Sequence, residues 1–298
     1  MRAVTLRVIR RILRHLDSAL DAGEVSFQQG ATSTNGRESA IECFLYSIEM
    51  PDAGAATYLA EHIRRLVRTL AMLPLGTPET RALELGSYLQ MAATMERVLG
   101  YGSVRPAYYG ADAGIDTKTL LIKGQSPFRS EIDVFDAEVD TYPYADGSFD
   151  VVLCCELIEH LIHDPMHMLV ECWRVLKGNG LFVLTTPNTV SLSSVAAALN
   201  GRHNPQVFSR YPAKGNQDIP HVREYTPFEI VQALQSAGFE IQTLITERMP
   251  KCEHATWVID LLRQNKFETS LRGEQIYCLS RKRSGGVLER FPAFLYSS

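Results

Sequence analysis

Two uninterrupted apolar runs lie close together in the middle of the chain. The first covers Phe149–Cys155 and the second covers residues 180–186. A strand that is apolar on both faces is typical of a parallel sheet with helices above and below it. Between the runs, residues 164–177 carry apolar side chains at helical spacing, with Pro165 in the first turn and a Gly-Asn-Gly stop after Lys177. The pattern predicts a strand–helix–strand unit with a right-handed crossover.

The same patterns predict further elements on either side of this unit. Thr226 and Glu229 are spaced as a capping box, which predicts that a helix begins there. Residues 117–130 fit either a helix or an extra excursion of the chain. The other predicted strands are 81–87, 107–112, 132–135, 239–245 and 275–280, and the other predicted helices are 37–48, 55–73, 90–99 and one within 249–268. Strands alternating with helices indicate a doubly wound α/β sheet.

Length and composition place this sheet within a larger chain. The 298 residues divide into a predicted helical segment (1–78), a sheet domain (79–283) and a tail without pattern (284–298). Hydrophobic content of 45% is enough to bury a core, and the net charge of −4 gives no global indication of nucleic-acid binding. The six cysteines form no Cys-x-x-Cys pair, which favours reduced thiols in a cytoplasmic protein. Apolar runs stay shorter than the roughly 18 residues of a membrane span.

The first 21 residues predict a basic amphipathic helix. Ile9, Leu13, Leu16 and Leu20 form an apolar stripe, and arginines occupy much of the remainder. Such a helix can pack on its own domain or on another subunit of a homo-oligomer, lie on an anionic membrane surface, or act as a targeting sequence. The sequence leaves these three alternatives open.

Several short motifs follow one another along the sheet domain. They are Asp136-Ala137, Phe149-Asp150-Val151-Val152, Glu156-x-x-Glu159-His160-Leu161, Arg174-Val175-Leu176-Lys177 and Thr186-Pro187-Asn188. In this order and spacing they resemble the class I S-adenosylmethionine (SAM) methyltransferases, and the resemblance extends over about residues 81–283. It implies SAM as the cofactor and a Rossmann-like sheet of seven strands, the last antiparallel. It also implies that the N-terminal helices cap the active site.

The resemblance assigns a set of cofactor-binding residues. In the family, a loop after the first strand holds the methionine part of SAM, an acid after the second strand binds the ribose hydroxyls, and an Asp-Ala pair after the third reads the adenine. The matching residues here are Glu84, Gly86, Ser87, Asp112 (with Asp116 as the alternative), Asp136 and Ala137. Tyr88 and Gln90 replace two glycines of the loop motif. We interpret this as variant cofactor binding, and a scaffold that has lost SAM is the alternative.

A candidate metal site follows the fourth predicted strand. If a helical turn begins at Glu156, then Glu156, Glu159 and His160 share one face. Together with His221 they resemble the four ligands of Mg²⁺ in small-RNA 3′-terminal 2′-O-methyltransferases, which implies a divalent ion, Mg²⁺ or Mn²⁺, at these positions. Two alternatives remain open. Either His160 or His221 acts as a proton acceptor without metal, or these residues are structural.

The acceptor is indicated by an insertion between residues 189 and 220. It is rich in polar and aromatic side chains that suit sugars and also RNA. The segments 200–204 and 221–226 resemble methyltransferases of surface-polysaccharide assembly, which implies a sugar hydroxyl of a glycan or glycosylated small molecule. The 2′-hydroxyl at an RNA 3′ end is the alternative acceptor. The acidic balance of the chain counts against it.

Overall fold

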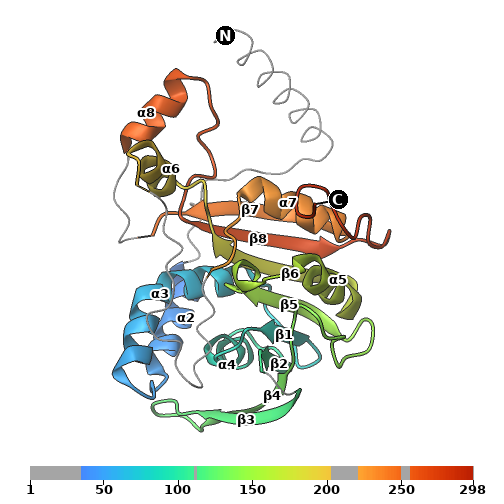
Figure 1. The fold of residues 1–298 in the computed structure, drawn as a ribbon. Helices are drawn as coiled ribbons and strands as arrows, with labels where there is room; N and C mark the ends of the chain where they lie inside the picture. The colour runs from blue at the N-terminus through green and yellow to red at the C-terminus, as the bar shows by residue number, and fades with distance from the viewer. Residues whose placement is uncertain (1–34, 111–112, 203–220, 250–255, 298) are drawn as a thin grey trace.

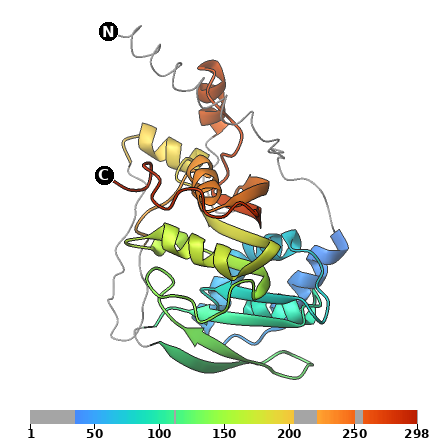
Figure 2. The ribbon, with the colours of Figure 1, turned by 90° about the vertical axis from the view of Figure 1, so that its right-hand side faces the viewer.

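The computed structural model describes residues 35–110, 113–202, 221–249 and 256–297 (Figures 1 and 2). The predicted basic helix at 1–21 and most of the 189–220 insertion therefore lie outside the described residues, as does Asp112. None of the described helices combines the length and the apolar character that crossing a membrane requires.

The described part of the chain forms one eight-stranded sheet with the order β3-β4-β2-β1-β5-β6-β8-β7. The five central strands β4, β2, β1, β5 and β6 run parallel, while β3, β8 and β7 pair antiparallel. Their bounds are β1 (Arg81–Leu85), β2 (Ser103–Tyr108), β3 (Gly114–Leu120), β4 (Phe128–Val134), β5 (Phe149–Cys155), β6 (Leu176–Pro187), β7 (Phe239–Glu247) and β8 (Gln275–Lys282).

Helices cover both faces of this sheet, as the two-sided apolar strands predicted (Figure 1). In β5, Val152 and Cys154 pack toward α5 and α7, whereas Val151 and Leu153 pack toward α2, α3 and α4. The helices are α2 (Asn35–Ser47), α3 (Ala53–Met72), α4 (Gln90–Arg97), the short 3-10 helix η1 (Ile158–His160), α5 (Pro165–Val175), α6 (Leu192–Leu199), α7 (Pro227–Ser236) and α8 (Thr256–Gln264).

The sheet has eight strands rather than the expected seven. The additional strand β3 pairs antiparallel with β4 from Gly114–Val134 to Leu120–Phe128, in the region whose pattern was ambiguous. Ile115, Thr117 and Thr119 are β-branched and favour a strand. Both faces of β3 are largely exposed, so no core-facing alternation marks it in the sequence.

The tail from residue 284 is an integral part of the fold. Phe294, Leu295 and Tyr296 pack against the apolar cluster that α5 and α7 share with the sheet. Arg290 and the Tyr296 hydroxyl both donate to the carboxylate of Asp164, which caps the N-terminus of α5. The tail is therefore tied to the loop that precedes α5.

Candidate functional site

The buried carboxylate of Glu84 holds the loop after β1. Glu84 Oε2 accepts hydrogen bonds from Ser87 Oγ (2.8 Å) and from the amide of Ala92 at the start of α4 (3.0 Å). Burial raises the pKa of Glu84 to about 7. Gly86 has φ +71°, a conformation that glycine adopts without strain. Glu84 and Ser87 were predicted to bind cofactor, and the structure shows both shaping the loop.

A cavity of about 200 Å³, the Asp136 cavity, opens at the carboxyl edge of the sheet. Asp136 and Ala137 line it together with Gly86 and His160, and residues 161–163 line it as well. Asp136 Oδ1 accepts from the amide of Glu138 (2.8 Å). Of the two acids considered for ribose, Asp112 lies outside the described residues and Asp116 accepts from the Tyr108 hydroxyl (2.8 Å).

Glu138 holds the segment of residues 161–164, part of which lines this cavity. Its buried carboxylate accepts hydrogen bonds from three consecutive amides, those of Ile162, His163 and Asp164. No periodicity or motif marks Glu138 in the sequence, since a single acid after Asp136-Ala137 resembles any turn residue. Asp164 links this segment onward to Arg290 in the tail.

A second cavity of about 500 Å³, the His221 cavity, also borders the loop after β1. Helix α3 supplies one wall, and the ends of β5, β6 and β8 supply another. Leu85, Gly86 and His160 line both cavities. The two cavities therefore meet at Gly86 and His160.

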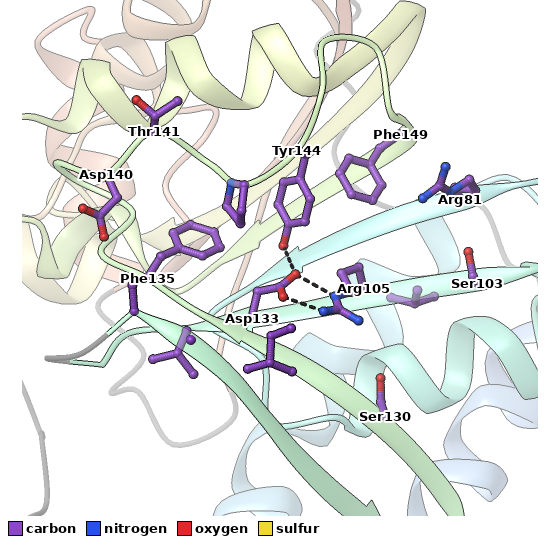
Figure 3. Close-up of a pocket in the computed structure, with 16 residues that line it drawn as sticks. Arg81, Ser103, Arg105, Ser130, Asp133, Phe135, Asp140, Thr141, Tyr144 and Phe149 are labelled. Atoms are coloured by element: carbon purple, nitrogen blue, oxygen red, sulfur yellow. Dashed lines mark hydrogen bonds and ion pairs between the residues drawn. The ribbon is translucent and has the colours of Figure 1, made fainter.

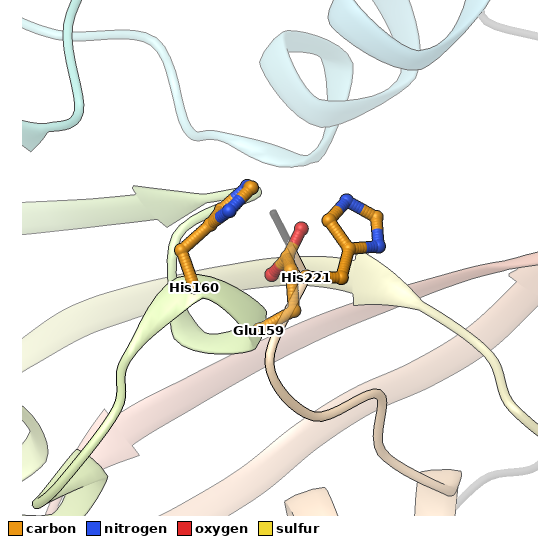
Figure 4. A group of neighbouring side chains, drawn as sticks. All are labelled: Glu159, His160 and His221. Atoms are coloured by element: carbon orange, nitrogen blue, oxygen red, sulfur yellow. The ribbon is translucent and has the colours of Figure 1, made fainter. Parts of the chain in front are cut away.

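Three predicted ligands converge beside the His221 cavity, which His160 and His221 line (Figure 4). Among the described residues, Glu159, His160 and His221 each offer a ligand atom within 4.8 Å of the others. The backbone explains the convergence, because the carbonyl of Glu159 accepts from the amides of Val222 (2.7 Å) and Arg223 (3.2 Å), directly after His221. Residues 61 positions apart in sequence are joined in this way.

Glu159 carries an unsatisfied carboxylate oxygen. The side chain is fully buried, Oε2 accepts from Thr186 Oγ1 (2.8 Å), and Oε1 has no hydrogen-bond partner among the described residues. Burial, and then the negative charge of Glu156, raise the pKa of Glu159 well above its ordinary value. A cation beside Oε1 would remove this penalty, so the residues present fit a divalent metal.

Glu156, the fourth predicted ligand, lines the same cavity but is not one of the three residues that converge. Its φ of +51° places it outside η1, so it does not share a helical face with Glu159 and His160 as the sequence suggested. Its carboxylate pairs with Arg65 of α3 (2.8 Å) and also accepts from Thr185 and Gln275. Arg65 lies 91 residues away in sequence, where nothing marked it as a partner.

Glu224 orients His221. Its Oε1 lies 3.1 Å from His221 Nδ1. A hydrogen bond from Nδ1–H to this carboxylate leaves the Nε2 lone pair for a cation or a proton, which is how ligand histidines are commonly held. The sequence motif contained Glu224 without revealing this role.

The comparisons with known proteins agree with this geometry. Residues 99–184 match the family described as methyltransferase domain. Within residues 99–184 the chain is therefore similar to methyltransferase domains. A protein of Mycolicibacterium smegmatis named as a probable S-adenosylmethionine-dependent methyltransferase is 32% identical over 143 residues, which are 45% of this chain and 49% of that protein. A ubiquinone biosynthesis O-methyltransferase of Psychrobacter arcticus is 31% identical over 145 residues, 46% of this chain and 53% of that protein.

Among solved structures, a SAM-dependent methyltransferase from Archaeoglobus fulgidus aligns with a TM-score of 0.46 at 17% identity, covering 76% of this chain and 99% of that one. The chain spans about half the length of the curated relatives described above. The matched domain contains Asp136, Ala137 and the turn from Glu156 to His160, but not Arg65 or His221.

Proposed function

We propose that this protein transfers the methyl group of SAM to a hydroxyl of a sugar, in a glycan or a glycosylated small molecule. The observation that carries the proposal is the meeting of two cavities at Gly86 and His160. The Asp136 cavity takes the adenosine part of SAM and the His221 cavity takes the acceptor. Donor and acceptor then approach each other at the shared wall.

The donor side follows from the carboxyl edge of the sheet, where open α/β sheets bind their ligands. Asp136 offers a carboxylate acceptor for the adenine amino group, and Ala137 lines the cavity beside it. The departures at Tyr88 and Gln90 leave a loop in which Gly86 and Leu89 both have positive φ, 71° and 72°. Tyr88 lines the acceptor cavity rather than filling the donor side.

The acceptor side combines aromatic rings with hydrogen-bonding groups. The rings of Tyr58 and His62 are 4.4 Å apart and those of Tyr58 and Tyr88 are 6.5 Å apart, all along one wall. Glu156 and Gln275 line the same cavity. Rings pack on the apolar faces of a sugar, while carboxylates and amides bind its hydroxyls. The hydroxyl chemistry is consistent with the relative named as an O-methyltransferase.

The reaction forms one bond and breaks one bond. The acceptor oxygen attacks the methyl carbon, the carbon–sulfur bond breaks, and S-adenosylhomocysteine leaves. In the metal-free alternative the hydroxyl proton passes to His160, which lines both cavities, or to His221. Holding donor and acceptor in line supplies most of the rate.

We further propose that Glu159, His160 and His221 hold a divalent cation, Mg²⁺ or Mn²⁺. When bound, such an ion favours the ionised form of a nearby hydroxyl. The buried Oε1 of Glu159 supports this assignment, because an unpaired carboxylate there is costly without a positive charge. Glu156, neutralised by Arg65, would act as an acceptor-binding group instead.

The test follows labelled methyl transfer from SAM to two pools, glycans and short RNA, each with and without EDTA. Transfer to glycan that is lost with EDTA and restored by Mg²⁺ or Mn²⁺ would support the acceptor and the metal together. EDTA-resistant transfer would assign proton removal to a histidine alone. Transfer to RNA would refute the sugar acceptor. If no pool is methylated and calorimetry detects no SAM binding, the protein is an inactive scaffold.

A further inference from the structure

The outer edge of the sheet is formed by β3, which projects beyond the helical layers (Figures 1 and 2). Most of its side chains are exposed, including Ile115 at 66%, and Leu121 follows at 52%. An edge strand presents unpaired backbone N–H and C=O groups that can pair with another strand. Among the described residues no strand pairs with β3 on the side away from β4, although residues 121–123 beyond its end pair with residues 47–49.

The charges on this edge are arranged symmetrically about Thr117. Asp116 and Lys118 both lie on the face of Tyr108, because Asp116 Oδ2 accepts from the Tyr108 hydroxyl (2.8 Å) and Lys118 Nζ lies 4.3 Å from the centre of its ring. In an antiparallel pair, residues directly opposite each other point to the same face. A two-fold axis at Thr117 therefore places Asp116 of each copy opposite Lys118 of the other.

The neighbouring same-face registers are unfavourable. Moving the two-fold axis by one residue places either Asp116 opposite Asp116 or Lys118 opposite Lys118. A shift of the pairing that reverses the faces is incompatible with a two-fold axis perpendicular to the sheet. Lysine on an edge strand commonly prevents pairing. Here the neighbouring aspartate converts that charge into a self-complementary pair.

A hydrogen-bond network joins β2 and β4, the strands next to this edge (Figure 3). It borders a cavity of about 920 Å³, the Arg105 cavity, which Ile115 also lines. Arg105 of β2 donates to both oxygens of Asp133 on β4 (2.6 and 2.5 Å), and the Tyr144 hydroxyl donates to the same carboxylate (2.6 Å). An edge that is already ordered loses little entropy when it pairs.

We infer that β3 is a homodimer interface, at which two copies of the chain pair antiparallel about Thr117 and continue the sheet from one protomer into the other. The partner is a second copy because the charge pattern complements itself. Ile115 would then lie opposite Thr119 of the second copy. The inference is independent of the proposed methyl transfer.

Charge exchange on this strand tests the interface by sedimentation velocity, over concentrations that extend into the high micromolar range. The wild type is expected to form dimers. Asp116→Lys and Lys118→Asp should each weaken the dimer by about tenfold or more, since each places two like-charged pairs across the interface. An equal mixture of the two variants should dimerise again, because every pair is then between opposite charges. The double variant should also dimerise.

The mixture guards against loss of folding, because misfolded single variants would not recover a dimer together. Asp260→Lys, the same change on the exposed surface of α8, serves as the control and should leave the dimer unchanged. A wild type that stays monomeric throughout the series would overturn the inference. So would a dimer that neither single variant weakens, or single variants whose mixture stays monomeric.

Discussion

The two cavities that meet at His160 are built in different ways. The wall of the Asp136 cavity is fixed by internal hydrogen bonds, with Glu138 satisfied by three amides. The His221 cavity concentrates carboxylates instead: Glu84 and Glu156 line it, and Glu159 lies beneath with an oxygen that has no hydrogen-bond partner among the described residues. One side is held together by internal hydrogen bonds, while the other contains a buried carboxylate oxygen without a hydrogen-bond partner among the described residues.

The same contrast appears in the comparisons. Apart from Leu85 and Gly86, the Asp136 cavity is lined from within residues 99–184, the matched methyltransferase domain. Of the residues that line the His221 cavity, Cys155, Glu156 and His160 fall within that range. The Asp136 cavity therefore lies mostly within the range matched by the family model, while the His221 cavity is built largely by segments outside that range.

The largest effect is expected from Glu159→Gln. The substitution keeps the shape and an acceptor for Thr186, but it removes the negative charge. We expect methyl transfer to fall below detection and affinity for Mn²⁺ to fall at least about a hundredfold, beyond what loss of an outer-shell partner costs. Calorimetric titration of Mn²⁺ measures the second effect without turnover. Glu240→Gln, on an exposed position of β7, is the matched control. An equal loss of Mn²⁺ affinity in both variants would refute the proposed role of Glu159.

Glu84→Gln should change stability rather than metal binding. The folded-state pKa of Glu84 is raised from 4.5 to about 7, so the native state binds more protons than the unfolded state in this window. The unfolding free energy of the wild type should therefore fall as pH rises from 4.5 to about 7, by up to about 3 kcal/mol. The variant should lack this fall. Urea unfolding of both proteins across the window measures the difference, and parallel pH curves would contradict it.

Asp136→Ala probes the preorganised side. Losing one hydrogen bond from a charged acceptor should weaken SAM about tenfold or more, while Mn²⁺ affinity stays unchanged. Calorimetry with each ligand separates the two cavities. Asp260→Ala on α8 controls for the loss of an aspartate. Equal weakening of SAM binding and Mn²⁺ binding would show that the Asp136 and His221 cavities do not bind their ligands independently.

Arg290→Gln should have the smallest effect. It removes a part-exposed ion pair to Asp164, so the loop at 161–164 is held less firmly. We expect affinity for SAM to fall by about threefold, with the KM for the acceptor unchanged. Arg290→Lys should recover part of the affinity. A changed KM for the acceptor with unchanged affinity for SAM would contradict this prediction, because the tail would then act on the His221 cavity.

The strands β5 and β6 were predictable because each carries a run that is apolar on both faces. By contrast, β2 and β4 begin at Ser103 and Phe128, each four residues before its predicted start, because they lack such a run. β5 spans the predicted run Phe149–Cys155, and α5 starts at the predicted Pro165. The capping box of Thr226 and Glu229 is also confirmed. β3 was missed because it buries neither face, so hydrophobic periodicity carries no information about it.

The site was predictable only where a motif placed residues at fixed spacing. Glu159, His160 and His221 converge as predicted, whereas Glu156 does not, because its positive φ breaks the assumed helical turn. Arg65, Glu138 and Arg290 act through contacts between residues distant in sequence. No local pattern encodes such contacts. The predicted domain boundaries and the role of the first 21 residues stay predictions.

The most direct test of the account asks whether a cation and the transferable methyl group lie side by side. SAM carrying a ¹³C-methyl group is bound to the protein, and its methyl resonance is followed by NMR as Mn²⁺ is added, with Mg²⁺ as the diamagnetic reference. We predict strong paramagnetic broadening that Mg²⁺ does not cause and that Glu159→Gln abolishes. A sharp methyl resonance with both SAM and Mn²⁺ bound would contradict the meeting of the two cavities at His160.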